Sequence, residues 1–194
     1  MIKSIGTKKI NTAVFISGNG SNLEKLIKFS ILIKSPIRIN FVISSNSKAK
    51  GIKFSKKYNI KYKILSFRNK TQDEKKTLVF LKRYNVKLIC LAGFMKILSK
   101  NFIKKFNGKI LNVHPSLLPK YKGLNTHERA INDGAKFAGC TIHLVNSRLD
   151  SGKIIMQKKV KINKTDTPSK LAKKVLKQEH ILYPKALIKL FSNR

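Results

Sequence analysis

Asn112 and His114 are the first residues whose types and spacing suggest chemistry. They lie two positions apart, so on an extended backbone both side chains leave the same face. The apolar residues around them predict a short buried strand, which runs into a proline-containing loop over residues 115–123. Open α/β sheets place their catalytic groups at the carboxyl ends of such strands. Spacing alone fits a buried polar pair that only satisfies a turn equally well, and both interpretations stay open.

Asp150 is the third candidate, and it is one of only eight acidic residues in the chain. It lies in the polar segment 146–152, which is expected to form the tip of a hairpin. With Asn112 and His114 it would suit acyl transfer, because histidine can carry a proton, an amide can donate to an oxyanion and a carboxylate can orient the histidine or a water. A hydrolytic triad is disfavoured, since no serine lies in a Gly-x-Ser-x-Gly elbow. Taken alone, Asp150 would be an ordinary turn residue.

The other histidines and the two cysteines are interpreted as structural. His127 could cap a helix, and His143 and His180 resemble the lone histidines that usually serve packing. Cys90 and Cys140 fall in predicted strands without CxxC or metal-ligand spacing. We therefore expect buried free thiols and no metal site.

A glycine-containing turn provides a second candidate site. Ser17-Gly-Asn-Gly-Ser-Asn connects an apolar strand over residues 12–16 with a helix over residues 23–29. This arrangement aims backbone N–H groups and the positive end of the helix at an anion, which predicts a phosphate cradle. NAD binding is disfavoured, because the turn lacks a third glycine and an acidic residue about 20 positions later. Ser21 and Asn22 could also act only as helix caps.

Alternating strands and helices would position these residues. We expect strands at residues 12–16, 38–44, 61–65, 86–92 and from 110, and helices at 23–29, 48–58, 73–84 and 99–106. This order predicts an α/β fold, a Rossmann-like doubly wound, mostly parallel sheet. The apolar segment 94–98 would then be core at the sheet edge or the wall of a pocket for a flat ligand, and the sequence leaves both open.

The last third of the chain has a different pattern. After a short helix at residues 128–132, strands at 137–145 and 154–162 predict an antiparallel hairpin. A long C-terminal helix is expected from Pro168 to about Phe191, with Pro184 bending or dividing it. The domain would cover residues 12–194, after a basic N-terminal arm at residues 1–11.

Composition limits the class of protein. The 194 residues, 42% of them hydrophobic, suffice for one domain with a substantial core. No apolar run approaches the length of about 20 residues that a bilayer requires, and we expect a cytoplasmic protein without membrane contact.

The formal net charge of +35 is the strongest compositional signal. It suggests nucleic-acid binding, but the basic residues are nearly all lysines, scattered along the chain, and arginine is the usual specific reader of bases and phosphates. We therefore expect attraction for anionic substrates and only non-specific contact with nucleic acids. A non-catalytic RNA-binding protein is the rival interpretation from another class.

Five blocks, in this order and at these intervals, closely resemble the phosphoribosylglycinamide formyltransferases, the folate-dependent enzymes of purine synthesis. The blocks are Ile16-Ser-Gly-Asn-Gly-Ser-Asn-Leu23, Leu91-Ala-Gly-Phe-Met-Lys-Ile-Leu98, Leu111-Asn-Val-His-Pro-Ser-Leu-Leu-Pro119, Leu149-Asp-Ser-Gly152 and Gln178-Glu-His180. Methionyl-tRNA formyltransferases and formyltetrahydrofolate deformylases share the central block. Each of those carries an additional domain, for which we expect no room in this chain.

The resemblance implies transfer of the formyl group of 10-formyltetrahydrofolate to the amine of 5′-phosphoribosylglycinamide, without a metal, by a monomer or a homodimer. The implied catalytic residues are Asn112, His114 and Asp150. The implied ribonucleotide-binding residues are Gly20, Ser21, Asn22, Leu23 and Glu24, with Glu179 at the amine. The implied folate-binding residues are Met95, Lys96, Ile97, Leu98, Asn146, Ser147, Arg148 and Leu149. The folate-side arginine of the family corresponds either to Arg68 or to Lys70, and the sequence does not decide between them.

Overall fold

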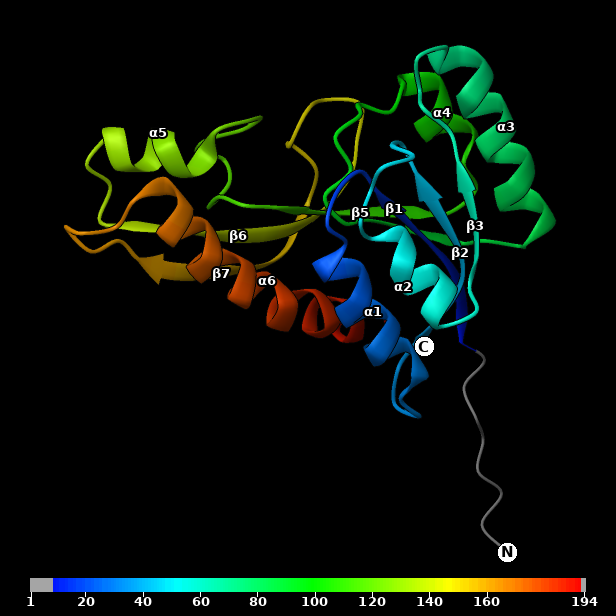
Figure 1. Cartoon of the computed structure of the whole chain (residues 1–194), viewed down its shortest axis with the longest axis horizontal. Coiled ribbons are helices and arrows are strands. Elements are labelled where there is room, and N and C mark those ends of the chain that lie inside the picture. Colours follow the sequence, from blue (N-terminus) through cyan, green and yellow to red (C-terminus); the bar gives the residue numbers. More distant parts are fainter. Residues whose placement is uncertain (1–8, 193–194) are drawn as a thin grey trace, which may run out of the picture.

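A seven-stranded sheet forms the centre of the protein in a computed structural model, which describes residues 9–192 (Figure 1). The strands are β1 (Ile10–Ile16), β2 (Ile37–Ser44), β3 (Lys61–Ile64), β4 (Leu88–Leu91), β5 (Lys109–His114), β6 (Phe137–Leu144) and β7 (Ile154–Lys161). The helices are α1 (Ser21–Ile31), α2 (Ile52–Lys57), α3 (Lys70–Arg83), α4 (Lys100–Lys105), α5 (Thr126–Asn132) and α6 (Pro168–Phe191).

The order of the strands in the sheet is β3-β2-β1-β4-β5-β6-β7. The first five strands run parallel, and β6 and β7 form an antiparallel hairpin beside β5. The predicted doubly wound sheet with a C-terminal hairpin and helix is therefore confirmed. The strand order reverses between β1 and β4, and open α/β sheets bind ligands beyond the carboxyl ends of strands at such a switch point.

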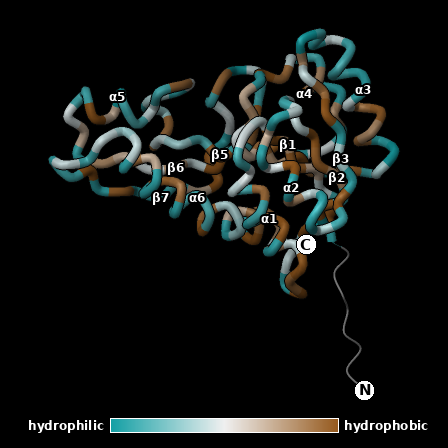
Figure 2. The backbone as a smooth tube through the Cα atoms, viewed as in Figure 1, coloured by the Kyte–Doolittle hydropathy of each residue, from teal (hydrophilic) through white to brown (hydrophobic). Residues whose placement is uncertain are grey.

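Two hydrophobic clusters lie on opposite faces of the sheet. Side chains alternate along β1, so Val14 and Ile16 pack with α1 and α6, while Ala13 and Phe15 pack with α3 and α4. Figure 2 shows the hydrophobic segments gathered in the central strands. Because β1 and β4 are covered on both faces, they are apolar along nearly their whole length.

Several predicted boundaries were wrong. Strand β1 begins at Ile10, two residues inside the predicted basic arm, and residues 1–8 of that arm lie outside the described part of the chain. Helix α3 begins at Lys70, capped by the Asn69 side chain, because Asn69 accepts a hydrogen bond from the Gln72 N–H.

The predicted helix over residues 48–58 is shorter than expected, since α2 begins only at Ile52. The reason is a close backbone approach, in which a Cβ added at Gly20 would lie 2.5 Å from the Cα of Gly51. The Gly51 N–H donates to the Gly18 carbonyl at 3.0 Å, so residues that could extend α2 instead hold the turn after β1.

Pro184 does not divide the C-terminal helix, contrary to one of the two outcomes expected for it. Helix α6 runs without interruption from Pro168 to Phe191 and buries residues on both sides of the proline, among them Tyr183 and Leu187. The packing of this face outweighs the hydrogen bond that proline cannot donate.

Cys90 and Cys140 are free and buried, as predicted. Among residues 9–192, no helix is long and apolar enough to cross a membrane.

Candidate active site

Strands β5 and β6 bring the first candidates to the edge of the sheet. Asn112 of β5 is paired in register with His143 of β6, and His114 is paired with Thr141. Directly opposite residues of an antiparallel pair project from the same face. Asp150 lies in the loop between β6 and β7, and this loop places its carboxylate beside His114 and Asn112.

The three residues predicted from spacing and composition lie together. The Nδ1 atom of His114 is 3.3 Å from Oδ2 of Asp150, and Nδ2 of Asn112 is 3.5 Å from Oδ1 of the same carboxylate. The N–H of Gly123 donates to Asp150 at 2.9 Å, which ties the hairpin loop to the segment that follows β5. The side chains of His114 and Asp150 are almost fully buried. The Asp150 carboxylate therefore contacts the side chains of both His114 and Asn112.

His114 is arranged to accept a proton. Its Nε2 atom is 2.8 Å from the carbonyl of Tyr121, and a carbonyl only accepts, so Nε2 carries the hydrogen. Burial lowers the pKa of His114 more than the Tyr121 carbonyl and the Asp150 carboxylate raise it. The ring thus takes up a proton less readily than a free imidazole, and Nδ1 is the ring nitrogen that faces Asp150. A proton that arrives at Nδ1 would be stabilised by the carboxylate beside it.

Asp150 is ionised in this environment. Burial favours its neutral form, but the interactions with His143, the Gly123 N–H and His114 outweigh burial, so the pKa of Asp150 lies below its ordinary value. The backbone of Asp150 is left-handed, with φ 46°, and so is that of Tyr121, with φ 54°. Non-glycine residues in this region carry local strain, which is common in active sites.

His143 belongs to the same cluster, and sequence reasoning missed it. Its Nε2 atom lies 3.2 Å from Nδ2 of Asn112 and 3.6 Å from Oδ1 of Asp150. The side chain is only 2% exposed. The one available signal was the alternation of strand 137–145, but this signal identifies the neighbours of His143 only once the register with β5 is known.

The other two histidines lie elsewhere. His127 is the second residue of α5, whose N-cap is Asn125, so the expectation that His127 caps this helix was wrong. Its Nδ1 atom is buried and has no hydrogen-bond partner in the described part of the chain, and burial lowers the pKa of His127. Burial likewise lowers the pKa of His180 on α6.

The predicted phosphate cradle lies where β1 meets α1. Gly20 is the N-cap of α1 in the left-handed conformation, with φ 74°, and the backbones of Ser21, Asn22 and Leu23 form the first turn. The first N–H groups of a helix have no partner within it, so this turn can receive an anion. The side chain of Leu23 is fully buried in the core. The carboxylate of Glu24 pairs with Lys28 at 2.8 Å.

Asn22 connects this turn to Glu179 of α6. Its Nδ2 atom donates to Oε2 of Glu179 at 2.7 Å, although the two residues are 157 positions apart. Both side chains are buried, and burial raises the pKa of Glu179 despite the hydrogen bond from Asn22. Oδ1 of Asn22 is buried and has no hydrogen-bond partner among residues 9–192.

A cavity of ≈ 700 Å³ lies beside the cradle, at the carboxyl ends of the parallel strands. Its lining residues are Ser17, Ser45, Asn46, Ser47, Ser66, Arg68, Met95 and Lys96. Arg68 faces this cavity, whereas Lys70 is the first residue of α3 and does not line it. Of the two basic residues that the sequence left open, Arg68 is therefore the one that lines this cavity.

The apolar segment after β4, residues 94–98, contains both core residues and exposed residues that could form a pocket wall. Met95 and Ile97 are 68% and 65% exposed, so they can form a pocket wall, whereas Leu98 is buried in the core. The Met95 N–H donates to the Ser17 hydroxyl at 2.7 Å, which joins this segment to the turn after β1. Asn146, Ser147, Arg148 and Leu149 form the exposed part of the hairpin loop next to Asp150.

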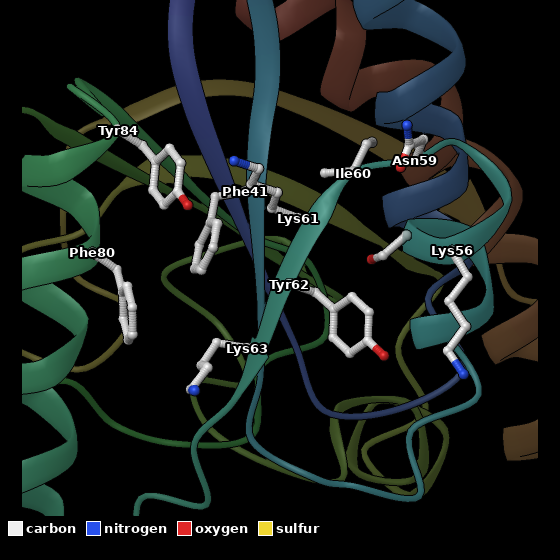
Figure 3. Close-up of a pocket in the computed structure, with 10 residues that line it drawn as sticks. Phe41, Lys56, Asn59, Ile60, Lys61, Tyr62, Lys63, Phe80 and Tyr84 are labelled. Atoms are coloured by element: carbon white, nitrogen blue, oxygen red, sulfur yellow. The ribbon is translucent and has the colours of Figure 1, made fainter.

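A second cavity, of ≈ 490 Å³, lies at the sheet edge formed by β3 (Figure 3). Aromatic rings of Phe41, Phe80 and Tyr84 and the side chains of Lys61 and Lys63 surround it. None of its lining residues belongs to the predicted sites, and three strands separate β3 from β5, which carries Asn112.

Among residues 9–192, no group of three or more metal-ligating side chains comes together.

Comparison with known proteins identifies the family of the chain. Residues 10–187 match the family described as Formyl transferase. The chain is 41% identical over 188 residues to a phosphoribosylglycinamide formyltransferase of Haemophilus influenzae, covering 95% of this chain and 87% of that protein. A crystal structure of the Brucella melitensis phosphoribosylglycinamide formyltransferase superposes with a TM-score of 0.89 at 41% identity, covering 95% of this chain and 96% of that one.

A longer relative matches as well. The chain is 38% identical over 187 residues to the human trifunctional purine biosynthetic protein adenosine-3, covering 95% of this chain and 18% of that protein. The chain thus spans under a fifth of the length of this relative. The resemblance inferred from the five sequence blocks is confirmed.

Proposed function

Because the chain belongs to the formyl transferase family, we propose that it transfers the formyl group of 10-formyltetrahydrofolate to the amine of 5′-phosphoribosylglycinamide, a step of purine synthesis. The convergence of Asn112, His114 and Asp150 at the end of β5 carries this proposal. These are an amide donor, a neutral imidazole and a carboxylate within contact of one another. Their chemistry suits attack by an amine on a carbonyl carbon.

The reaction balances without a metal or a covalent enzyme intermediate. The neutral amine attacks the formyl carbon, a new C–N bond forms, and the carbonyl oxygen becomes an oxyanion. The bond from that carbon to N10 of the folate then breaks, and the proton lost by the amine is delivered to N10. Holding both reactants in one cleft contributes much of the acceleration, since effective molarities reach about 10⁵ M or more in well-aligned sites.

Each member of the trio has its own role in this proposal. Asn112 donates an N–H to the oxyanion. His114 takes a proton at Nδ1, directly or through a water, and its positive charge then also stabilises the oxyanion. Asp150 holds the imidazolium and the water that carries the proton to the leaving nitrogen. The short contact of Nε2 with the Tyr121 carbonyl supports this assignment, because it leaves Nδ1 as the free base of the ring.

The other predicted residues would bind the two substrates. The phosphate of the ribonucleotide lies on the first turn of α1, at Gly20, Ser21 and Asn22, and Glu179 holds the glycinamide amine. The folate lies between the segment Met95–Leu98 and the hairpin loop 146–149, with its glutamate carboxylate at Arg68. The cavity of ≈ 700 Å³ and its positive lining support this placement. Both substrates are anions, which suits a strongly basic protein.

An assay of the purified protein tests the proposal directly. Formyl transfer from 10-formyltetrahydrofolate to 5′-phosphoribosylglycinamide is followed by the appearance of tetrahydrofolate and of the formylated product. Folded protein, verified by circular dichroism, should show saturable turnover with both substrates. Folded protein that produces neither product would refute the proposal.

Substitution of the trio tests the assigned roles. Asn112→Ala, His114→Ala and Asp150→Ala should each lower kcat by about 10²-fold or more, because each removes an oxyanion donor or a proton-transfer group. Asn163→Ala is the matched control, since Asn163 lies exposed in the loop before α6, and its kcat should stay within about twofold of wild type. Near-wild-type turnover in any trio variant removes that residue from the mechanism.

A further inference from the structure

His143 lies directly across the strand pair from Asn112, and the mechanism proposed above gives it no role. The two residues are in-register partners on β6 and β5. His143 is 2% exposed, so its ring is fixed by the surrounding protein and contributes no surface. A buried imidazole in contact with a reacting group is either a packing residue or a part of the chemistry. Its hydrogen bonds distinguish these possibilities.

The tautomer of His143 follows from its contacts. Its Nδ1 atom is 2.9 Å from the carbonyl of Leu144, and a carbonyl accepts, so Nδ1 carries the hydrogen. In the neutral ring Nε2 then has only a lone pair. The group 3.2 Å from this lone pair is the Nδ2 atom of Asn112, which can only donate. Asn112 therefore donates to His143.

This contact determines how the Asn112 amide is turned. With Nδ2 toward His143, its second N–H points to Oδ1 of Asp150 at 3.5 Å. If the amide were rotated by half a turn, its Oδ1 atom would face both a carboxylate oxygen and the lone pair of His143. Three acceptors would then meet without a hydrogen between them, which is costly in a buried site. His143 and Asp150 together exclude the rotated amide.

We propose that His143 is a positioning residue for formyl transfer, which by accepting one N–H of Asn112 fixes the amide so that its other N–H is presented to the oxyanion. The inference rests on the function proposed above and adds a fourth residue to the site. The contact of that second N–H with Asp150 is the longer of the two, so an oxyanion can replace it. His143 itself does not touch the substrate.

Two substitutions separate this role from packing. His143→Phe keeps a planar ring but removes the acceptor, and it should lower kcat about tenfold or more while each KM changes by less than about threefold. His143→Gln places an amide oxygen where Nε2 lies, so it should retain most of kcat. Unchanged kcat in His143→Phe, or an equal loss in both variants, would overturn the inference. His180→Phe is the matched control, since His180 lies on α6, and its kcat should stay within about twofold.

A double substitution tests whether His143 acts through Asn112. If it does, Asn112→Ala/His143→Phe should be no slower than Asn112→Ala alone, because the group that His143 positions is already absent. Losses that multiply would show an independent role and contradict the inference. Circular dichroism and urea unfolding of each variant establish that the comparison is made between folded proteins.

A spectroscopic measurement tests the geometry without any turnover. Nitrogen-15 NMR of the histidine rings near pH 7 should show a protonated Nδ1 and an unprotonated Nε2 for His143, assigned by comparison with His143→Gln. A hydrogen on Nε2, which would then donate to Asp150, overturns the inference. Because this measurement needs no substrate, it remains decisive even if the wild-type protein shows no formyl transfer and the proposed function itself fails.

Discussion

Arg68 is the residue whose proposed contact with the folate can be tested by a single substitution. It lines the cavity beside Met95, whereas Lys70, two positions later, begins α3 outside the cavity. We predict that Arg68→Ala raises the KM for 10-formyltetrahydrofolate about tenfold or more, with a smaller change in kcat. The reason is that a charge-assisted hydrogen bond to the carboxylate of the folate contributes about 1.5–3 kcal/mol. Steady-state kinetics with varied folate concentration measures this effect.

The neighbouring lysine provides the control for that experiment. Lys70→Ala removes one positive charge at nearly the same place in the chain, and its KM for the folate should remain within about twofold of wild type. Arg68→Lys should recover only part of the affinity, since an ammonium group does not reproduce the planar, two-pronged contact of a guanidinium. Equal effects of Arg68→Ala and Lys70→Ala would mean that only the general positive field attracts the folate.

At the level of residues, the sequence selected candidates whose signal was local or rare, and the structure brings three of them together. Asn112 and His114 were recognised by their two-residue spacing, and Asp150 by the scarcity of acids in a basic chain. His143 was not recognised, because its contact with Asn112 depends on the register between β5 and β6. A shift of one residue in that register would have turned His143 to the opposite face. The register between two strands cannot be inferred from the sequence alone.

At the scale of elements, the turn after β1 depends on a glycine that resembled a helix residue in the sequence. A Cβ added at Gly51 would lie 2.8 Å from Cδ1 of Ile16 and 2.9 Å from Cα of Gly20. We predict that Gly51→Ala lowers the free energy of unfolding by about 1–3 kcal/mol, because the backbone of the turn between β1 and α1 must shift. It should also raise the KM for the ribonucleotide more than the KM for the folate. Urea unfolding and steady-state kinetics measure the two effects.

Gly18 is a matched control in the same turn. A Cβ added at Gly18 meets no atom of the described residues within 4 Å. Gly18→Ala should therefore leave the free energy of unfolding within about 0.5 kcal/mol of wild type. A similar loss in both variants would indicate that the turn is sensitive to any side chain, and that the approach of Gly20 to Gly51 is not the cause.

The elements most accurately predicted were those with a strong apolar pattern. The buried strands and the C-terminal hairpin agree with the structure within about two residues, a common uncertainty at the ends of elements. The start of α2 was misplaced by four residues, from residue 48 to Ile52, because a contact with a distant turn overrode the local helical pattern. Likewise, the local effect of Pro184 was overcome by the packing of α6 against the sheet.

At the scale of the whole molecule, the few acidic residues are used for specific contacts. Seven of the eight have a partner that fixes or neutralises them. Asp73 and Glu74 are buried acceptors of backbone N–H groups, and Asp166 pairs with Lys174 at 2.6 Å. The other four are Glu24, Asp133, Asp150 and Glu179. The acidic residues therefore neutralise little of the positive charge of the exposed lysines, and the surface attracts anions.

Three of the four histidines give the folded protein a predictable response to pH. Burial lowers the pKa values of His114, His127 and His180 below the ordinary value of 6.5 that they have in the unfolded chain. Below about pH 6.5 the unfolded state then binds more protons than the folded state. We predict that the free energy of unfolding falls as the pH is lowered from about 7 to 5. Urea unfolding at several pH values, at constant ionic strength, measures this slope.

Glu179 has the opposite effect and supplies the control for that prediction. Burial raises its pKa above 4.5, so its contribution to stability is present at low pH and is lost as the pH rises through its folded-state pKa. Glu179→Gln removes this opposing contribution and should steepen the loss of stability on acidification. His127→Gln should make the loss shallower, because one fewer half-buried ring with a lowered pKa gains a proton on unfolding. A wild-type protein that becomes more stable between pH 7 and pH 5 would contradict the assignment of neutral, buried histidines, including the neutral His114 on which the proposed proton transfer depends.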